Sequence, residues 1–182
     1  MTESSFLSDA RRVIEIEREA LDTISQRLDS DFLRACEAII ACAGRIVVTG
    51  TGKSGQIGSK IASTLASTGT PSFFVHSGEA SHGDLGMITP DDIVIAISNS
   101  GETSEIQTIV PIIKRMEVTL IAMTGSLNST LARASTFTLN IGVDREACPH
   151  DLAPTASTTA TLALGDALAV SILKARNFKK ED

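Results

Sequence analysis

The stretch that decides the fold reads Arg45-Ile46-Val47-Val48-Thr49-Gly50-Thr51-Gly52-Lys53-Ser54-Gly55. An apolar, β-branched run typical of a buried strand leads directly into a glycine-rich turn, and residues 56–67 continue with helical spacing. The first N–H groups of a helix have no partner within the helix, and the helix dipole is positive there. The turn therefore predicts a place where an anion can bind.

A second stretch of the same design follows further along the chain. The apolar run 93–97 leads into Ser98-Asn99-Ser100-Gly101-Glu102-Thr103-Ser104-Glu105. The hydroxyls of Ser98, Ser100 and Thr103, together with the backbone donors of the turn, match the oxygens of a phosphate group. Ordinary N-capping explains part of this pattern, but not so many hydroxyls in one turn. Two such turns from one sheet predict a single phosphate-bearing ligand.

Short β-branched runs and helical stretches alternate along the whole chain. Strands are expected at 46–49, 72–76, 93–98, 119–123 and 137–141, and helices at 7–28, 31–42, 56–67, 103–115, 128–133 and 155–176. This order predicts an α/β protein, a three-layer α/β/α sandwich with a mostly parallel five-stranded, Rossmann-like sheet. We expect one domain over 1–182, with N-terminal helices at about 7–42 and an α/β core at about 45–176. Ligands of such sheets bind at the carboxyl ends of the strands, where both turns lie.

Composition excludes several classes of partner. The net charge of -6 argues against nucleic acid, and the 3% aromatic content, without Trp or Tyr, argues against a base-stacking platform. The most apolar segment, 160–173, is too short to span a bilayer and reads as a buried helix, so we expect no membrane partner. Three cysteines without a CxxC pair, and a start without a secretory signal, favour the reducing cytoplasm.

The first turn admits two nucleotide-binding interpretations. Gly50-x-Gly52-x-x-Gly55 matches the dinucleotide fingerprint, but no acidic residue ends the next strand as that motif requires. A P-loop would need glycine at position 47, which is Val47. Lys53 is unusual because a cation in the first turn of a helix is repelled by the helix dipole. An anionic ligand nearby would make the position of the cation favourable. A solvated surface lysine is the alternative.

Five separated motifs resemble the sugar isomerase (SIS) domain and, more narrowly, the family of D-arabinose 5-phosphate isomerases. They are 50–55, 72–76, 82–87, 98–105, and 153–161 together with 165–167, and the resemblance runs from about residue 10 to 180. It implies the SIS fold and an aldose-ketose exchange between D-ribulose 5-phosphate and D-arabinose 5-phosphate through an enediol, serving 3-deoxy-D-manno-octulosonate (Kdo) and lipopolysaccharide biosynthesis. Such chemistry needs a base, an acid and a group that stabilises the developing negative oxygen, and no redox cofactor.

The resemblance also implies roles for individual residues. The catalytic positions are Lys53, Glu105 and Glu146. Either glutamate could be the proton-transfer carboxylate, while Lys53 would stabilise the enediolate or organise the loop. The substrate-binding positions implied are Gly52, Ser54, Gly69, Thr70, His82, Ser98, Ser100 and Thr103. His76 matches a zinc-binding histidine of the family, and because no His/Cys cluster has catalytic-zinc spacing, zinc there is expected to be inhibitory or adventitious.

Two other functions remain open at this point. One is a 6-phospho-3-hexuloisomerase, and the other is a phosphosugar-binding module without turnover, although the chain lacks the helix-turn-helix and basic charge of a DNA-binding regulator. The apolar stripe of 7–28 and the small-residue helix 155–173 predict self-association, and the family implies a homotetramer. Family members usually continue into a Ser-His-Pro-Gly-Gly segment with a catalytic histidine and then a pair of CBS domains. This chain has no CBS domain, so activity of this short form is a separate question.

Overall fold

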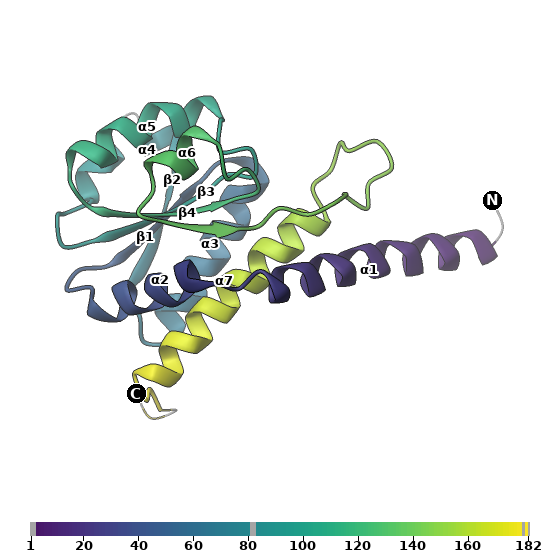
Figure 1. The fold of residues 1–182 in the computed structure, drawn as a ribbon, viewed down its shortest axis with the longest axis horizontal. Coiled ribbons are helices and arrows are strands. Elements are labelled where there is room, and N and C mark those ends of the chain that lie inside the picture. The colour runs from purple at the N-terminus through teal and green to yellow at the C-terminus, as the bar shows by residue number, and fades with distance from the viewer. Residues whose placement is uncertain (1–2, 81–82, 180, 182) are drawn as a thin grey trace.

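Five parallel strands form the centre of the protein (Figure 1), seen in a computed structural model that describes residues 3–80, 83–179 and 181. The strands are β1 (Ile46–Gly50), β2 (Ser72–His76), β3 (Ile93–Ile97), β4 (Thr119–Thr124) and β5 (Phe137–Asn140), in the order β2-β1-β3-β4-β5. Every neighbouring pair is parallel, with Ile46 opposite both Ser72 and Ile93. The predicted α/β/α sandwich is confirmed, and its sheet is parallel throughout.

Alternation of side chains divides the core into two layers. In β1, Ile46 and Val48 join the cluster made by α2 (Ser30–Ala41), α3 (Gly52–Ser67) and α7 (Ala156–Ala175). Val47 points the other way, into the cluster formed with α5 (Ser104–Arg115) and α6 (Thr130–Ala134). Because both faces are covered, the central strands are continuous apolar runs.

Helix α3 begins at Gly52, four residues before the start expected from its apolar spacing. This places Lys53 in the first turn of the helix. The glycines allow a close approach at the junction, since a Cβ on residue 55 would lie 3.0 Å from the carbonyl oxygen of Gly50. Two short elements were not predicted, α4 (Ser77–Ala80) and a 3-10 turn, η1 (Asp84–Met87).

Helix α7 is the most apolar helix and crosses one face of the molecule. The helix has 20 residues and contains an 18-residue window with a mean hydropathy of 1.4, so by length and composition it could cross a membrane, unlike the shorter segment 160–173 considered from the sequence. Half of the helix is nevertheless buried within the protein, where it packs against α1 (Glu3–Gln26), α2 and α3, as predicted for a buried helix. Apolar side chains of α7 are therefore accounted for by packing in the core.

Helix α1 is only partly covered. Ile16, Ala20 and Ile24 are buried against the body of the protein. The N-terminal part of α1 extends away from the remainder of the molecule (Figure 1), and there Phe6, Leu7 and Ile14 are 59%, 57% and 67% exposed. The predicted stripe itself is also partly in solvent, since Val13, Leu21 and Leu28 are 36%, 37% and 47% exposed.

Candidate active site

Both polar turns lie at the carboxyl edge of the sheet, as predicted. The second turn is held in place by the loop that joins β4 to α6: the N–H of Gly125 donates to the Asn99 carbonyl at 2.9 Å, and the N–H of Leu131 donates to the Gly101 carbonyl at 3.2 Å. The Glu102 carboxylate accepts the N–H of Thr130 at 2.5 Å. Because these contacts fix its backbone, the turn is organised before any ligand arrives.

The three hydroxyls of this turn differ in what they already bind. The Ser98 hydroxyl accepts the N–H of Gly101 at 3.1 Å, and the Ser100 hydroxyl accepts the N–H of Glu102 at 3.2 Å. Thr103 is the N-cap of α5, yet its side chain makes no capping hydrogen bond, and its buried hydroxyl has no partner among the described residues. A buried hydroxyl without a partner is costly, so Thr103 is a group that a ligand oxygen would satisfy.

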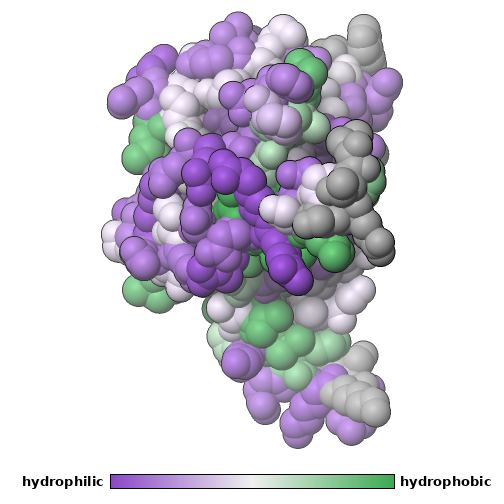
Figure 2. All heavy atoms as spheres, turned by 90° about the vertical axis from the view of Figure 1, so that its right-hand side faces the viewer, coloured by the Kyte–Doolittle hydropathy of each residue, from purple (hydrophilic) through white to green (hydrophobic). Residues whose placement is uncertain are grey.

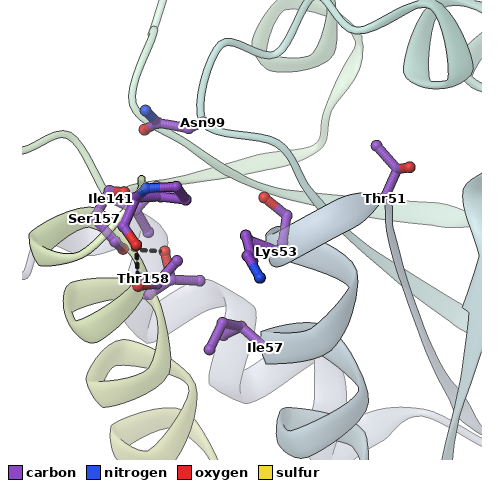
Figure 3. A pocket seen from close by; sticks show the side chains of 10 residues that line it. Thr51, Lys53, Ile57, Asn99, Ile141, Ser157 and Thr158 are labelled. Atoms are coloured by element: carbon purple, nitrogen blue, oxygen red, sulfur yellow. Dashed lines mark hydrogen bonds between the residues drawn. The ribbon is translucent and has the colours of Figure 1, made fainter. Parts of the chain in front are cut away.

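A pocket of about 240 Å³ opens between the start of α3 and the start of α7 (Figure 3). Lys53 and Ile57 project from α3, Ser157 and Thr158 face them from α7, and Asn99 lies above the gap. The remaining lining residues are Thr51, Ser54, Ile141, Pro154 and Thr161. The pocket thus brings together the first turn, the second turn and the 153–161 motif.

Sequence reasoning placed only Lys53 and Ser54 among these lining residues. It missed Thr51, Ile57, Asn99, Ile141, Pro154, Ser157, Thr158 and Thr161. Several of them lie within motifs noted in the sequence, next to residues that were chosen. Nothing in a one-dimensional pattern shows which side of a helix turn faces the pocket.

Glu146 borders the pocket through the start of α7. Its Oε2 accepts the N–H of Thr155 at 2.7 Å, the hydroxyl of Thr155 at 2.9 Å and the N–H of Ser157 at 3.3 Å. Burial raises the pKa of Glu146, but the hydrogen bonds from Ser157 and Thr155 outweigh it and bring the pKa below the ordinary value. Glu146 is therefore ionised at neutral pH, as a proton acceptor must be.

Glu105 lies in the first turn of α5. A hydrogen bond from its own backbone, then one from the Ser104 hydroxyl at 3.0 Å, lowers the pKa of Glu105, and His76 adds a smaller electrostatic contribution. His76 and Lys53 line a second, shallower hollow of about 530 Å³ beside Phe74. His76 thus connects Glu105 to the hollow that Lys53 also lines.

The structure does not bring every predicted site residue together. Gly69 and Thr70 precede β2, at the amino edge of the sheet, where Gly69 (φ 83°) lies against the Phe178 ring. The pocket forms at the opposite edge, so these two residues lie away from it in this chain, and their binding of substrate stays a prediction. Gly52 lines the second hollow rather than the pocket. His82 lies outside the described residues.

His76 lies at the end of β2, as predicted. Its Nδ1 accepts the N–H of Gly78 at 3.1 Å, which leaves Nε2 for another ligand. Among the residues that the structure describes, no group of three or more His, Cys, Asp or Glu side chains could hold a metal ion. Within the described residues, His76 is thus a single histidine donor and not part of such a group.

Comparison with known proteins gives consistent matches. Residues 39–171 match the SIS domain family. The arabinose 5-phosphate isomerase KdsD of Pseudomonas aeruginosa is 59% identical over 177 residues, and that of Yersinia pestis is 60% identical over the same length. Each match covers 97% of this chain and 54% of the relative, so the chain spans about half the length of these curated relatives.

A solved structure extends the likeness to three dimensions. An Escherichia coli protein, c3406, in complex with arabinose 5-phosphate, superposes with a TM-score of 0.96 at 41% identity. The match covers 100% of this chain and 97% of that one. The similarity therefore includes all the elements that position the pocket.

Proposed function

Because the chain belongs to the SIS domain family, we propose that it interconverts D-ribulose 5-phosphate and D-arabinose 5-phosphate through an enediol. The observation that carries this proposal is one pocket at the carboxyl edge of the sheet that joins a cation, Lys53, to the second turn through Asn99. An ionised carboxylate, Glu146, borders it through its hydrogen bond to Ser157. The relatives named as arabinose 5-phosphate isomerases support the choice of sugar.

The phosphate end of the substrate would bind the second turn. Ser98, Ser100 and Thr103 provide hydroxyls, and the start of α5 provides a positive dipole. The unpaired Thr103 hydroxyl would donate to a phosphate oxygen. Holding the phosphate there fixes the position of the reacting carbons relative to Lys53.

The reaction from ketose to aldose moves two protons. One passes from C1 to C2, and the other passes from the oxygen on C1 to the oxygen on C2. Glu146, which borders the Lys53 pocket, would transfer the proton between the carbons, and Glu105, in the first turn of α5, would move the proton between the oxygens. The Lys53 ammonium would stabilise the negative oxygen of the enediolate.

The direct test is turnover of D-ribulose 5-phosphate by this chain in the presence of a chelator, with D-arabinose 5-phosphate detected as the product. We expect the product to form, because proton transfer and electrostatic stabilisation require no cofactor. If zinc at His76 is inhibitory, activity without the chelator will be the same or lower. Tight binding of the sugar phosphate without turnover would instead indicate a binding module, and a preference for a six-carbon ketose phosphate would indicate a hexuloisomerase.

Replacing Glu105 by Gln is expected to lower kcat about 10²-fold. Glutamine keeps the shape of the side chain but can neither accept nor release a proton. Glu105 is partly exposed at the start of α5, so the free energy of unfolding should change little. Steady-state kinetics together with thermal unfolding check both statements, and Glu37→Gln on α2, exposed and absent from the pocket lining, is the matched control. An unchanged kcat in Glu105→Gln would remove Glu105 from the mechanism.

Assembly into a homotetramer is also part of the proposal. Exposed apolar side chains gather on α1, and an apolar hollow of about 240 Å³ between α1 and α7 is lined by Leu21, Leu28 and Ala163 among others. Figure 2 shows hydrophobic surface on the side toward which α1 projects, including the lower part where α7 ends. Exposed patches of this kind commonly mark interfaces.

We expect light scattering to give about four times the chain mass of 19.1 kDa. Introducing charge at exposed positions, as in Leu7→Glu with Ile14→Glu, should lower the assembly state without unfolding the chain, since both side chains are more than half exposed. A wild-type monomer at micromolar concentration would contradict the tetramer.

Cytoplasmic location and supply of product to Kdo and lipopolysaccharide biosynthesis complete the proposal. The three free cysteines suit a reducing compartment. The names of the relatives support the pathway. Loss of Kdo in cells depleted of this protein, restored by added arabinose 5-phosphate, is the corresponding test.

A further inference from the structure

Thr155 occupies the N-cap of α7 but does not cap its own helix. A threonine at this position normally accepts an N–H from the first turn through its hydroxyl, and here no such hydrogen bond is made. The Thr155 hydroxyl instead donates to Glu146 Oε2 at 2.9 Å and accepts the N–H of Ala147 at 2.8 Å. The Thr155 side chain thus hydrogen-bonds both to the carboxylate of Glu146 and to the backbone of the residue that follows it.

Glu146 takes over the capping role. Its Oε2 accepts the N–H groups of Thr155 and Ser157, which are the donors that a helix start leaves unpaired. All three hydrogen bonds to the carboxylate, counted over the described part of the chain, reach Oε2. These three hydrogen bonds therefore fix the position of Oε2.

We propose that Thr155 is a positioning residue that orients Glu146 for proton transfer in the Lys53 pocket. This inference rests on the proposed function, because it gives Glu146 a substrate to act on. Ser157, the other residue bound to Glu146, lines the pocket directly, so a carboxylate held against it is held at the pocket wall. Without the Thr155 hydroxyl, the Glu146 carboxylate would keep its two backbone donors. It would lose the contact through which Thr155 links it to the backbone N–H of Ala147.

The hydroxyl also affects the proton affinity of Glu146. A hydrogen bond donated to the charged form favours that form, so removing it raises the pKa of the carboxyl. A base acts only when ionised, and the acidic limb of the pH profile for kcat/KM should therefore move to higher pH. The ionisable groups around Glu146 are Asp144, Arg145, Cys148, His150 and Asp151 in its own loop, Glu19 on α1, which pairs with Arg145 at 2.6 Å, and Lys53 on α3. None of these groups is altered by a change at Thr155.

The experiment compares Thr155→Val, which keeps the shape but removes the hydroxyl, with Thr155→Ser, which keeps the hydroxyl. In the valine variant we expect kcat to fall about tenfold to a hundredfold with little change in KM, and the acidic limb to move to higher pH. The serine variant should recover both properties. Thr159→Val, in the next turn of α7 and absent from the pocket lining, is the control for a β-branched substitution in this helix.

A second measurement is independent of turnover. Titration of the Glu146 side-chain carboxyl by carbon NMR in the wild type and in Thr155→Val should show a higher pKa in the variant. An unchanged Glu146 titration overturns the proposal whether or not the chain is active. A shifted titration with an unchanged pH profile and kcat also overturns it, since the contact would then be structural only. A wild-type chain without turnover overturns the proposed function and the kinetic role of Thr155 together, and the titration alone then reports whether the contact exists.

Discussion

Replacing Lys53 by Met is expected to lower kcat about 10³-fold while leaving the protein as stable as the wild type or slightly more stable. The loss follows because no other cation projects into the pocket between α3 and α7 among the residues described there. The gain in stability follows because Lys53 lies in the first turn of α3, where a cation interacts unfavourably with the helix dipole. This interaction costs a few tenths of a kcal/mol to about 1 kcal/mol of folding free energy. A residue that costs stability and is required for turnover is one whose place is set by function.

Kinetics and thermal unfolding on the same preparation test this prediction. The matched control is Lys60→Met in the same helix, where the Lys60 ammonium pairs with Asp166 at 2.7 Å away from the pocket. This pair is about half exposed and contributes little, so the control should keep its kcat within a few-fold. Equal losses in the two variants would show that Lys53 acts through general charge rather than at the substrate.

Gly165→Val should produce the largest loss of stability, about 3 kcal/mol in the free energy of unfolding. A Cβ on residue 165 of α7 would lie 2.5 Å from both Cδ1 and Cγ1 of Ile61, a fully buried side chain of α3. Isoleucine is branched at Cβ and cannot turn away freely, so the two helices must separate. Because α3 and α7 are the walls of the pocket, the same change should raise KM for the substrate.

Chemical denaturation and kinetics measure the two effects. Combining Gly165→Val with Ile61→Ala should recover part of the stability that the two single changes lose separately, since the added methyl groups then enter the vacated volume. Gly86→Ala is the control, because a Cβ there meets nothing within 4 Å. If the double variant loses as much stability as the two single variants together, contact with Ile61 is not the reason that Gly165→Val is destabilising.

Much of the fold could be predicted because local patterns agree with the global arrangement. The apolar runs of β1, β3 and β4 are buried on both faces, and the helices between them cover those faces. The two polar turns were found because each follows a strand, and parallel strands place their carboxyl ends at one edge. The same logic does not place Gly69 and Thr70 at the site, because they precede β2 and so lie at the other edge of the sheet.

The sequence by itself determined which segments follow the strands and which chemical groups those segments carry. These groups are hydroxyls at 98–103, a cation at 53 and glycines that permit the turns. Only the tertiary structure decided that α7 meets α3, so that Ser157 and Thr158 face Lys53 from more than a hundred residues away in the chain. It also decided that Glu146, which in sequence reads as a solvated loop residue, ends against the start of α7. The physical reason is that strand and helix signals are local, whereas a carboxylate is held by donors that folding brings to it from a separate segment.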